Sequence, residues 1–297
     1  MTSRRQFIKK GLLSGFSTLS LTNLSKSAHF DELRDATSDE ELFALIRNQL
    51  HIPKERLYLN TGSLGPSPMV VTDAVHAMMQ QLEKNPAIEN WGDLGTKMEK
   101  VRTKVGELIN TDPEDVILTR NTTEGLSLIS QSLKLNKGDE ILTTTHEHGG
   151  GEVGLEYMAA TQGAVIKKLQ IPVPATSKEA VIEAVVNNIT PKTKVVMLSH
   201  VNTLTGLRMP FDEISKITKP KGILLIADGA QAAGLISVDV KSMGVDAYAA
   251  SGHKWMLGPK ETGFVYWSKE LQQKINPVFT SSGFGSYSAS SGTRNVA

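Results

Sequence analysis

The 297-residue sequence contains no cysteine and few aromatic residues. Without cysteine, this 297-residue sequence provides no disulfide, no thiolate metal site and no thiol nucleophile. A Walker A sequence is also absent, and no Gly-x-Gly-x-x-Gly opens a crossover helix, so the usual signs of nucleotide and dinucleotide binding are missing. The sequence has no internal repeat, and only the Ser/Gly-rich stretch 281–292 is of low complexity. With 39% apolar and 21% charged residues, the composition is that of a globular protein with a sizeable core.

Charge is distributed unevenly along the chain. The formal net charge is +1, but residues 1–28 contain five basic residues and no acidic residue, so the remainder carries −4. A mildly acidic body gives no reason to expect a nucleic-acid partner.

The N-terminus resembles a bacterial twin-arginine export signal. Arg4 and Arg5 are followed one residue later by Phe7, and a weakly apolar stretch occupies 11–24. That stretch is too short and too polar to span a bilayer as a helix. A disordered basic tail is the alternative, but the combined features favour export to the periplasm, with cleavage near Ala28. We therefore treat 1–28 as a signal segment outside the fold.

Hydrophobic periodicity predicts an α/β fold with a mostly parallel seven-stranded sheet and helices on both faces, because strand and helix patterns alternate after residue 113. Helices are predicted at 31–50, 69–82, 96–109, 123–135, 152–161, 178–189 and 212–218, with 86–95 as a connection. Strands are predicted at 116–119, 140–144, 164–169, 194–199, 222–227, 245–250 and 263–267.

Two apolar strands lead to side chains that are able to take part in a chemical reaction. The strand 222–227 leads to Asp228, and the strand 245–250 breaks at a glycine turn and presents Lys254. The 26 residues between them leave room for about one crossover connection, so the two groups are expected at neighbouring strand ends, where α/β sheets bind ligands. A lysine that forms an imine and a carboxylate that pairs with a pyridinium nitrogen suit a Schiff-base cofactor. A surface lysine and an ordinary Asp-Gly turn are the simpler readings.

The segment 119–126 follows a strand and opens a helix. Free N–H groups at a helix start, together with the hydroxyls of Thr122 and Thr123, favour an anion. The simpler interpretation is an ordinary N-cap, because Asn121 followed three residues later by Glu124 is a common helix start.

A pair of histidines follows the strand 140–144. His146 and His148 are two apart, so in an extended chain both imidazoles share a face and are able to bind a metal. Alternatively one of them lies flat on an aromatic cofactor ring, or neither has a ligand. No third metal ligand is evident nearby in the sequence, although His253 is a remote candidate for a metal-binding exported protein.

Taken together, these segments resemble the class V aminotransferase family of fold type I pyridoxal-phosphate (PLP) enzymes, over residues 58–295. The family includes cysteine desulfurases, kynureninases and isopenicillin N epimerase-like proteins. The stretches 58–66 and 200–206 are most similar to the epimerase-like branch.

The resemblance implies roles for the matching residues. Asp228, His148 and Lys254 would be catalytic: Asp228 pairs with the ring nitrogen, His148 stacks on the ring, and Lys254 forms the Schiff base and moves the Cα proton. Gln231 would contact the ring oxygen. The other cofactor-binding residues implied are Thr122, Thr123, Thr203, Ser251, His253 and, across a homodimer interface, Thr293.

The family pattern also implies a domain division. Residues 29–68 would form an N-terminal helix and active-site loop, 69–283 the PLP-binding large domain, and 284–297 the start of a small C-terminal domain. Family members continue for about a hundred further residues, which carry the arginine that binds the substrate carboxylate and the cysteine of the desulfurases. The sequence therefore leaves open transamination, epimerisation or elimination on an amino acid or amine, and also a truncated, inactive PLP-binding remnant.

Overall fold

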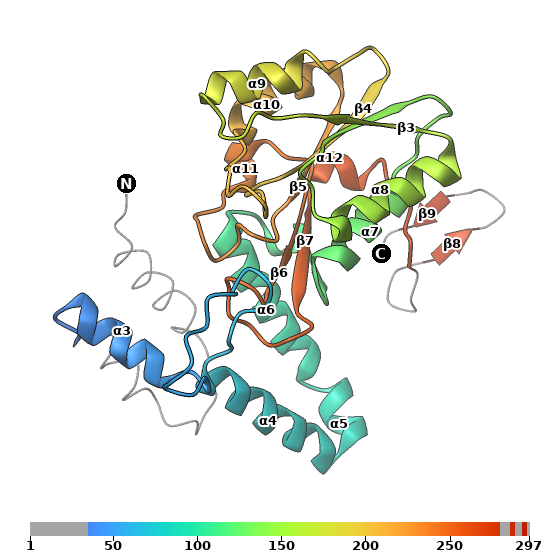
Figure 1. Ribbon diagram of the computed structural model, residues 1–297. Coiled ribbons are helices and arrows are strands. Elements are labelled where there is room, and N and C mark those ends of the chain that lie inside the picture. The colour runs from blue at the N-terminus through green and yellow to red at the C-terminus, as the bar shows by residue number, and fades with distance from the viewer. Residues whose placement is uncertain (1–34, 280–285, 289–292, 296–297) are drawn as a thin grey trace.

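A computed structural model of the chain describes residues 35–279 and two short strands at 286–288 and 293–295 (Figure 1). The predicted signal segment 1–28 lies outside this part. Within the described residues, no helix is both long and apolar enough to cross a membrane.

A seven-stranded sheet forms the centre of the molecule, with strand order β1-β7-β6-β5-β4-β2-β3. Strand β7 pairs antiparallel with β1 and β6, and the other pairs are parallel. The prediction of a mostly parallel seven-stranded sheet is confirmed. The strands are β1 Val116–Thr119, β2 Glu140–Thr144, β3 Val165–Leu169, β4 Thr193–Ser199, β5 Leu224–Asp228, β6 Ala247–Ser251 and β7 Gly263–Trp267.

Both faces of the central strands of the sheet are buried, which explains why these strands are mostly apolar in sequence. In β4, Val196 and Leu198 belong to one hydrophobic cluster, while Val195 and Met197 belong to another. Successive side chains of a strand point to opposite faces, so one strand supplies both clusters.

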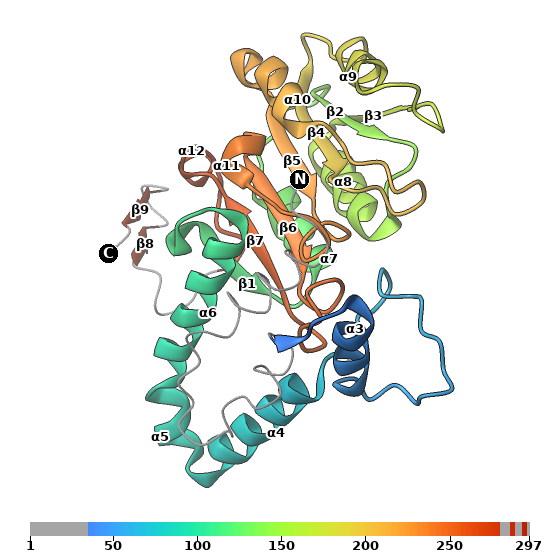
Figure 2. The same cartoon turned by 90° about the vertical axis from the view of Figure 1, so that its left-hand side faces the viewer.

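Each face is covered by its own helices (Figures 1 and 2). On one side, α6 (Leu94–Ile109), α9 (Lys178–Val186), α10 (Phe211–Thr218) and α11 (Val240–Met243) contribute buried side chains to the cluster that holds Val196. On the other, α7 (Thr122–Ser132), α8 (Gly149–Gln162) and α12 (Lys269–Gln272) contribute to the cluster that holds Met197.

The N-terminal helices differ from their predicted bounds. Helix α3 is Asp39–Asn48, shorter than the predicted 31–50, because the side chain of Ser38 accepts a hydrogen bond from the Glu41 N–H and caps the helix there. Helix α4 covers Met69–Lys84.

The predicted connection 86–95 was wrong, since it contains the helix α5, Pro86–Trp91. Proline is well suited to the first helical position, and the Asn85 side chain accepts from the Ile88 N–H. The strand β8, Ser286–Ser288, lies within the low-complexity stretch 281–292 and pairs with β9, Thr293–Asn295, which follows that stretch.

The parallel arrangement positions the candidate site. Strands β2, β4, β5 and β6 run the same way, and β1 joins them because it is antiparallel to β7, which is antiparallel to β6. All five carboxyl ends therefore lie along one edge of the sheet, where ligands bind in this class of fold. The segments that follow these ends carry the side chains described next.

Candidate active site

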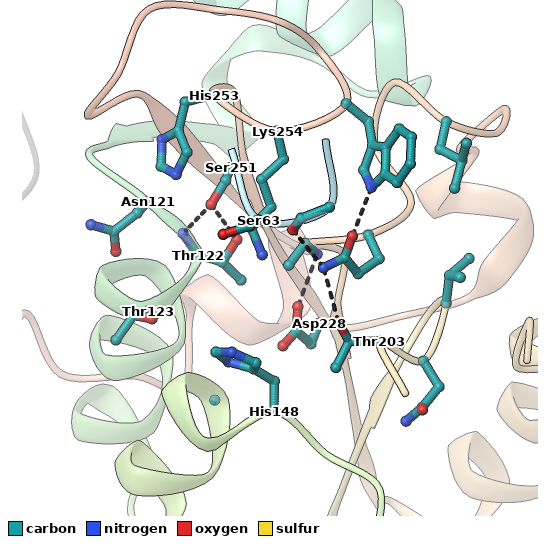
Figure 3. Close-up of a pocket in the computed structure, with 18 of the residues that line it drawn as sticks. Ser63, Asn121, Thr122, Thr123, His148, Thr203, Asp228, Ser251, His253 and Lys254 are labelled. Atoms are coloured by element: carbon teal, nitrogen blue, oxygen red, sulfur yellow. Dashed lines mark hydrogen bonds between the residues drawn. The ribbon is translucent and has the colours of Figure 1, made fainter. Parts of the chain in front are cut away.

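A cavity of about 730 Å³ opens at the carboxyl edge of the sheet (Figure 3). Nine of the ten residues predicted from the sequence line it: Thr122, Thr123, His148, Thr203, Asp228, Gln231, Ser251, His253 and Lys254. The tenth, Thr293, lies in β9, and its side chain is outside the described part. Five different segments of the chain thus converge on one space, as the sequence predicted for Lys254 and Asp228.

Asp228 is the buried acid of the cavity. It ends β5 with only 4% of its surface exposed, and its Oδ1 accepts a hydrogen bond from the Ala230 N–H at 2.8 Å. Burial raises the pKa of this carboxyl, while the Ala230 N–H and the positive charges of Lys254 and His148 act in the opposite direction. A buried carboxylate is stable only with a positive partner or a proton, so Asp228 is suited to bind a cationic N–H.

Lys254 follows β6, the strand next to β5, and is half-buried in the same cavity. Burial lowers the pKa of its amine, and the carboxylate of Asp228 partly offsets this. A lowered pKa increases the fraction of neutral amine, which is the nucleophilic form.

The start of α7 forms the other end of the cavity. The N-cap interpretation of the segment 119–126 is confirmed, because the Asn121 side chain accepts from the Glu124 N–H at 2.8 Å. The turn also faces the cavity, and its role as an anion site stays a prediction. The Thr122 N–H donates to Ser251 Oγ at 2.9 Å, and the two hydroxyls are 2.7 Å apart.

Two donors at this end have no acceptor among the described residues. One is the Thr123 N–H in the first turn of α7, for which no protein acceptor is present. The other is the His253 ring, whose buried Nδ1 has no hydrogen-bond partner. Burial lowers the pKa of His253. With the helix dipole, these groups are suited to bind an anion such as a phosphate.

Between these two ends lies His148, the N-cap of α8. Its Nδ1 accepts from the Gly150 N–H at 3.1 Å, which fixes the ring at the cavity wall (Figure 3). Glycines keep this wall open: a Cβ on Gly150 would lie 2.6 Å from Thr123 Oγ1, and one on Gly151 would lie 3.2 Å from Asp228 Oδ2. The space beside the imidazole therefore suits a flat ring.

The metal interpretation of the histidine pair finds no support. Among the described residues, no group of three or more His, Cys, Asp or Glu side chains is placed to hold a metal ion. The neighbouring Glu147 instead accepts hydrogen bonds from Thr144 Oγ1 at 2.6 Å and Ser199 Oγ at 2.5 Å, and burial raises its pKa. Glu147 thus ties the loop after β2 to the end of β4.

The N-terminal segment, predicted over 29–68 to form a helix and an active-site loop, also contributes to the cavity. Asn60, Gly62 and Ser63 line it. The Gly65 N–H donates to the His253 carbonyl at 2.7 Å, and a Cβ on Gly65 would lie 2.0 Å from the Lys254 carbonyl oxygen. Only glycine allows this approach, so the loop packs directly on the backbone that carries the lysine.

Sequence reasoning missed one prominent cavity residue, Trp255. Its indole N–H donates to Gln231 Oε1 at 2.7 Å, while Gln231 Nε2 donates to the Gly62 carbonyl and to Thr203 Oγ1. In the sequence, only its position directly after Lys254 pointed to Trp255. Its hydrogen bond to Gln231 joins residues 24 positions apart and depends on the directions of both side chains.

The fold and the site define a class: an α/β protein with a lysine, a buried aspartate and an anion site at one sheet edge, which is the arrangement of fold type I PLP enzymes. The sequence profile "Aminotransferase class-V" matches residues 57–294. The chain belongs to the class V aminotransferase family.

Curated relatives carry two kinds of name. The isopenicillin N epimerase of Amycolatopsis lactamdurans is 30% identical over 245 residues, covering 82% of this chain and 61% of the relative. A probable cysteine desulfurase of Halalkalibacterium halodurans is 32% identical over 229 residues, covering 75% and 55%. The chain therefore spans little more than half the length of these relatives.

Solved structures of a PLP-containing enzyme also match this chain. A mutant of the enzyme C-DES with glycine covalently linked to its PLP cofactor matches with a TM-score of 0.75 and 28% identity, covering 84% of this chain and 66% of the other. A second structure of C-DES, described as a cystine C–S lyase with its product cysteine persulfide, matches with a TM-score of 0.74. The expected fold type is confirmed.

PLP is the cofactor of this family, and the residues present fit it. The open donors at the start of α7 suit its phosphate, the half-buried Lys254 suits its aldehyde, and the buried Asp228 suits its ring nitrogen. The glycine-lined gap beside His148 matches a flat ring between them.

We expect Asp228→Asn to lower the pKa of Lys254 further, because the carboxylate raises that pKa against the effect of burial. The measurement is the pH dependence of reductive methylation of Lys254 in cofactor-free protein, followed by peptide mass spectrometry. Asp246→Asn is the matched control, since Asp246 is also buried but its carboxylate accepts from the Leu225 N–H. A Lys254 midpoint that stays in place or moves to higher pH in Asp228→Asn contradicts the assigned coupling.

Proposed function

We propose that this chain is the PLP-binding part of an enzyme that acts at the Cα of an amino acid or related amine. The observation that carries the proposal is the convergence of Lys254 and Asp228, at the ends of adjacent strands, on one cavity with an anion site. The whole-protein activity, its substrate and its partners are part of this proposal.

When bound, PLP supplies an aldehyde that bonds to amines and a protonated ring that withdraws electrons from the substrate Cα. The chain's own residues perform the rest. Asp228 would hold the proton on the ring nitrogen, His148 would confine the ring, and the start of α7 with Ser251 and His253 would bind the phosphate.

Lys254 has two roles in this scheme. Its amine would hold the cofactor, and the same amine would serve as base and acid for the proton at the substrate Cα. Its lowered pKa favours the neutral form that accepts a proton. The site is therefore arranged for proton removal and return at Cα.

These steps are shared by transamination, epimerisation and elimination. The relatives are named as an epimerase and as desulfurases. Both kinds of reaction take place at or next to the Cα of an amino acid. We propose an amino-acid substrate on this basis, with the reaction branch decided by residues that approach the Cα from outside the cofactor site.

Lys254→Ala, freed of bound amino acids and then loaded with PLP, is expected to lack the visible absorbance of the wild-type protein, because the covalent attachment is lost. Exchange of the Cα proton of added amino acids in D₂O, followed by NMR, should fall by about 10²–10⁴-fold. Lys260→Ala is the matched control: its ammonium donates to the Gly65 carbonyl at 2.7 Å, and it should keep the visible band. The proposal fails if wild-type protein never acquires such a band, or if Lys254→Ala retains it.

We also propose export by the twin-arginine route, supported by Arg4, Arg5 and Phe7 and by the acid-free start of the chain. Replacing both arginines with lysine should leave the full-length precursor in the cytoplasm, as read by fractionation and immunoblotting of a bacterial host. Lys9→Arg with Lys10→Arg preserves the arginine pair and should not change export. Equal periplasmic amounts of all three forms would exclude this route.

A homodimer is our third proposal. Helices α4 to α6 expose apolar side chains, among them Met79, Ile88 and Trp91, and the stretch 292–295 is similar to the family segment that crosses a dimer interface. Sedimentation velocity should give about twice the 32.2 kDa of one chain; a monomer at micromolar concentration would reject the proposal.

A further inference from the structure

One side-chain amide, that of Gln231, joins three segments around the cavity. Gln231 is 9% exposed. Its Oε1 accepts from Trp255 Nε1 at 2.7 Å, and its Nε2 donates to the Gly62 carbonyl at 2.9 Å and to Thr203 Oγ1 at 3.1 Å. The amide therefore connects the segment after β6, the N-terminal loop and the segment after β4.

The chemistry of the partners allows only one orientation of this amide. An indole N–H donates and never accepts, and a backbone carbonyl accepts and never donates. The Gln231 oxygen must face Trp255, and its nitrogen must face Gly62. Reversing the amide would set a donor against a donor and an acceptor against an acceptor.

The fixed orientation has a consequence for Thr203. Since Gln231 Nε2 donates to it, the Thr203 hydroxyl acts as acceptor there and keeps its own hydrogen for another partner. Thr203 lines the cavity and has no further hydrogen bond among the described contacts. Its hydroxyl hydrogen is thus available to an anionic oxygen of a bound ligand.

Both amide hydrogens of Gln231 are already engaged, one by Gly62 and one by Thr203. The direct contact between Gln231 and the cofactor ring oxygen that the family resemblance implies would require one of these bonds to open. In the arrangement seen here, Gln231 acts on a ligand through Thr203.

We propose that Trp255 is a positioning residue of the site. Its indole N–H orients the Gln231 amide, and this amide in turn holds the Gly62 loop in place and directs the Thr203 hydroxyl toward the ligand. The loop part of the proposal concerns the protein alone, whereas the ligand part rests on the proposed PLP function.

The loop part is tested by hydrogen exchange in cofactor-free protein. The N–H groups of Ser63, Leu64 and Gly65 are hydrogen-bonded, so their exchange reports opening of the loop. Trp255→Phe should accelerate exchange of these amides about three- to tenfold, the effect of one lost hydrogen bond. Trp267→Phe is the matched control, because the Trp267 indole N–H is buried without a partner, and it should leave the loop at the wild-type rate.

Gln231→Glu provides a second, independent variant. A glutamate retains an oxygen for Trp255 but removes the N–H donors to Gly62 and Thr203, so the loop should open as in Trp255→Phe. The double variant should open no more than the faster single variant, because both changes break one connected set of bonds. The proposal is overturned if the loop amides exchange at the same rate in Trp255→Phe as in Trp267→Phe. If Trp255→Phe does not fold, the proposal is overturned by a wild-type exchange rate in Gln231→Glu.

The ligand part is tested by absorbance titration of PLP-loaded protein. If the Thr203 hydroxyl no longer donates to the anionic ligand oxygen, that oxygen carries more negative charge and the nearest titrating proton is held more tightly. Trp255→Phe should therefore raise the midpoint of the visible-band titration by about 0.4–1 pH unit. Trp267→Phe should not move it. Faster loop exchange with an unchanged midpoint would overturn the role toward the ligand. Failure of wild-type protein to bind PLP would refute the proposed function but leave the exchange result intact.

Discussion

The structure depends on holding one carboxylate out of water. Asp228 ends a strand that is buried on both faces, and only 4% of its surface remains accessible. An isolated buried charge of this kind costs several kcal/mol, so the residue is tolerated because the cavity in front of it admits a positive partner. Lys254, which follows the neighbouring strand, is half-buried, and its charge acts on Asp228. The glycines opposite keep the space for a positive partner open.

Much of the fold could be predicted from the sequence because both faces of the sheet are covered. Strands in that situation are continuous apolar runs, and their ends are marked where the first polar residue appears. Asp228 and Lys254 were therefore recognisable as strand-end residues, and the parallel direction placed them at one edge. The segment that holds Thr122 was ambiguous in sequence, since it suits both a helix cap and an anion site. The structure has the cap, and Thr122 also lines the cavity.

The parts that sequence reasoning missed depend on signals of a different kind. Helix α5 begins at Pro86, which favours the first helical position, yet the stretch 86–95 was predicted as a connection. The start of α3 was marked by Ser38 and Glu41, a capping pair that the longer apolar pattern concealed. The Trp255–Gln231–Gly62 connection joins residues up to 193 positions apart through donor directions, which no local pattern encodes.

The wide spacing of the cavity residues has a consequence for the domain as a whole. Gly62, Thr122, His148, Thr203, Asp228 and Lys254 come from segments spread over almost 200 positions, and five sheet strands must be in register before they meet. Contacts of such high sequence separation form late in folding. A ligand held by all of them binds only the completed sheet, so its binding free energy adds to the stability of every strand at once. Occupancy of the cavity and survival of the folded domain are thermodynamically linked.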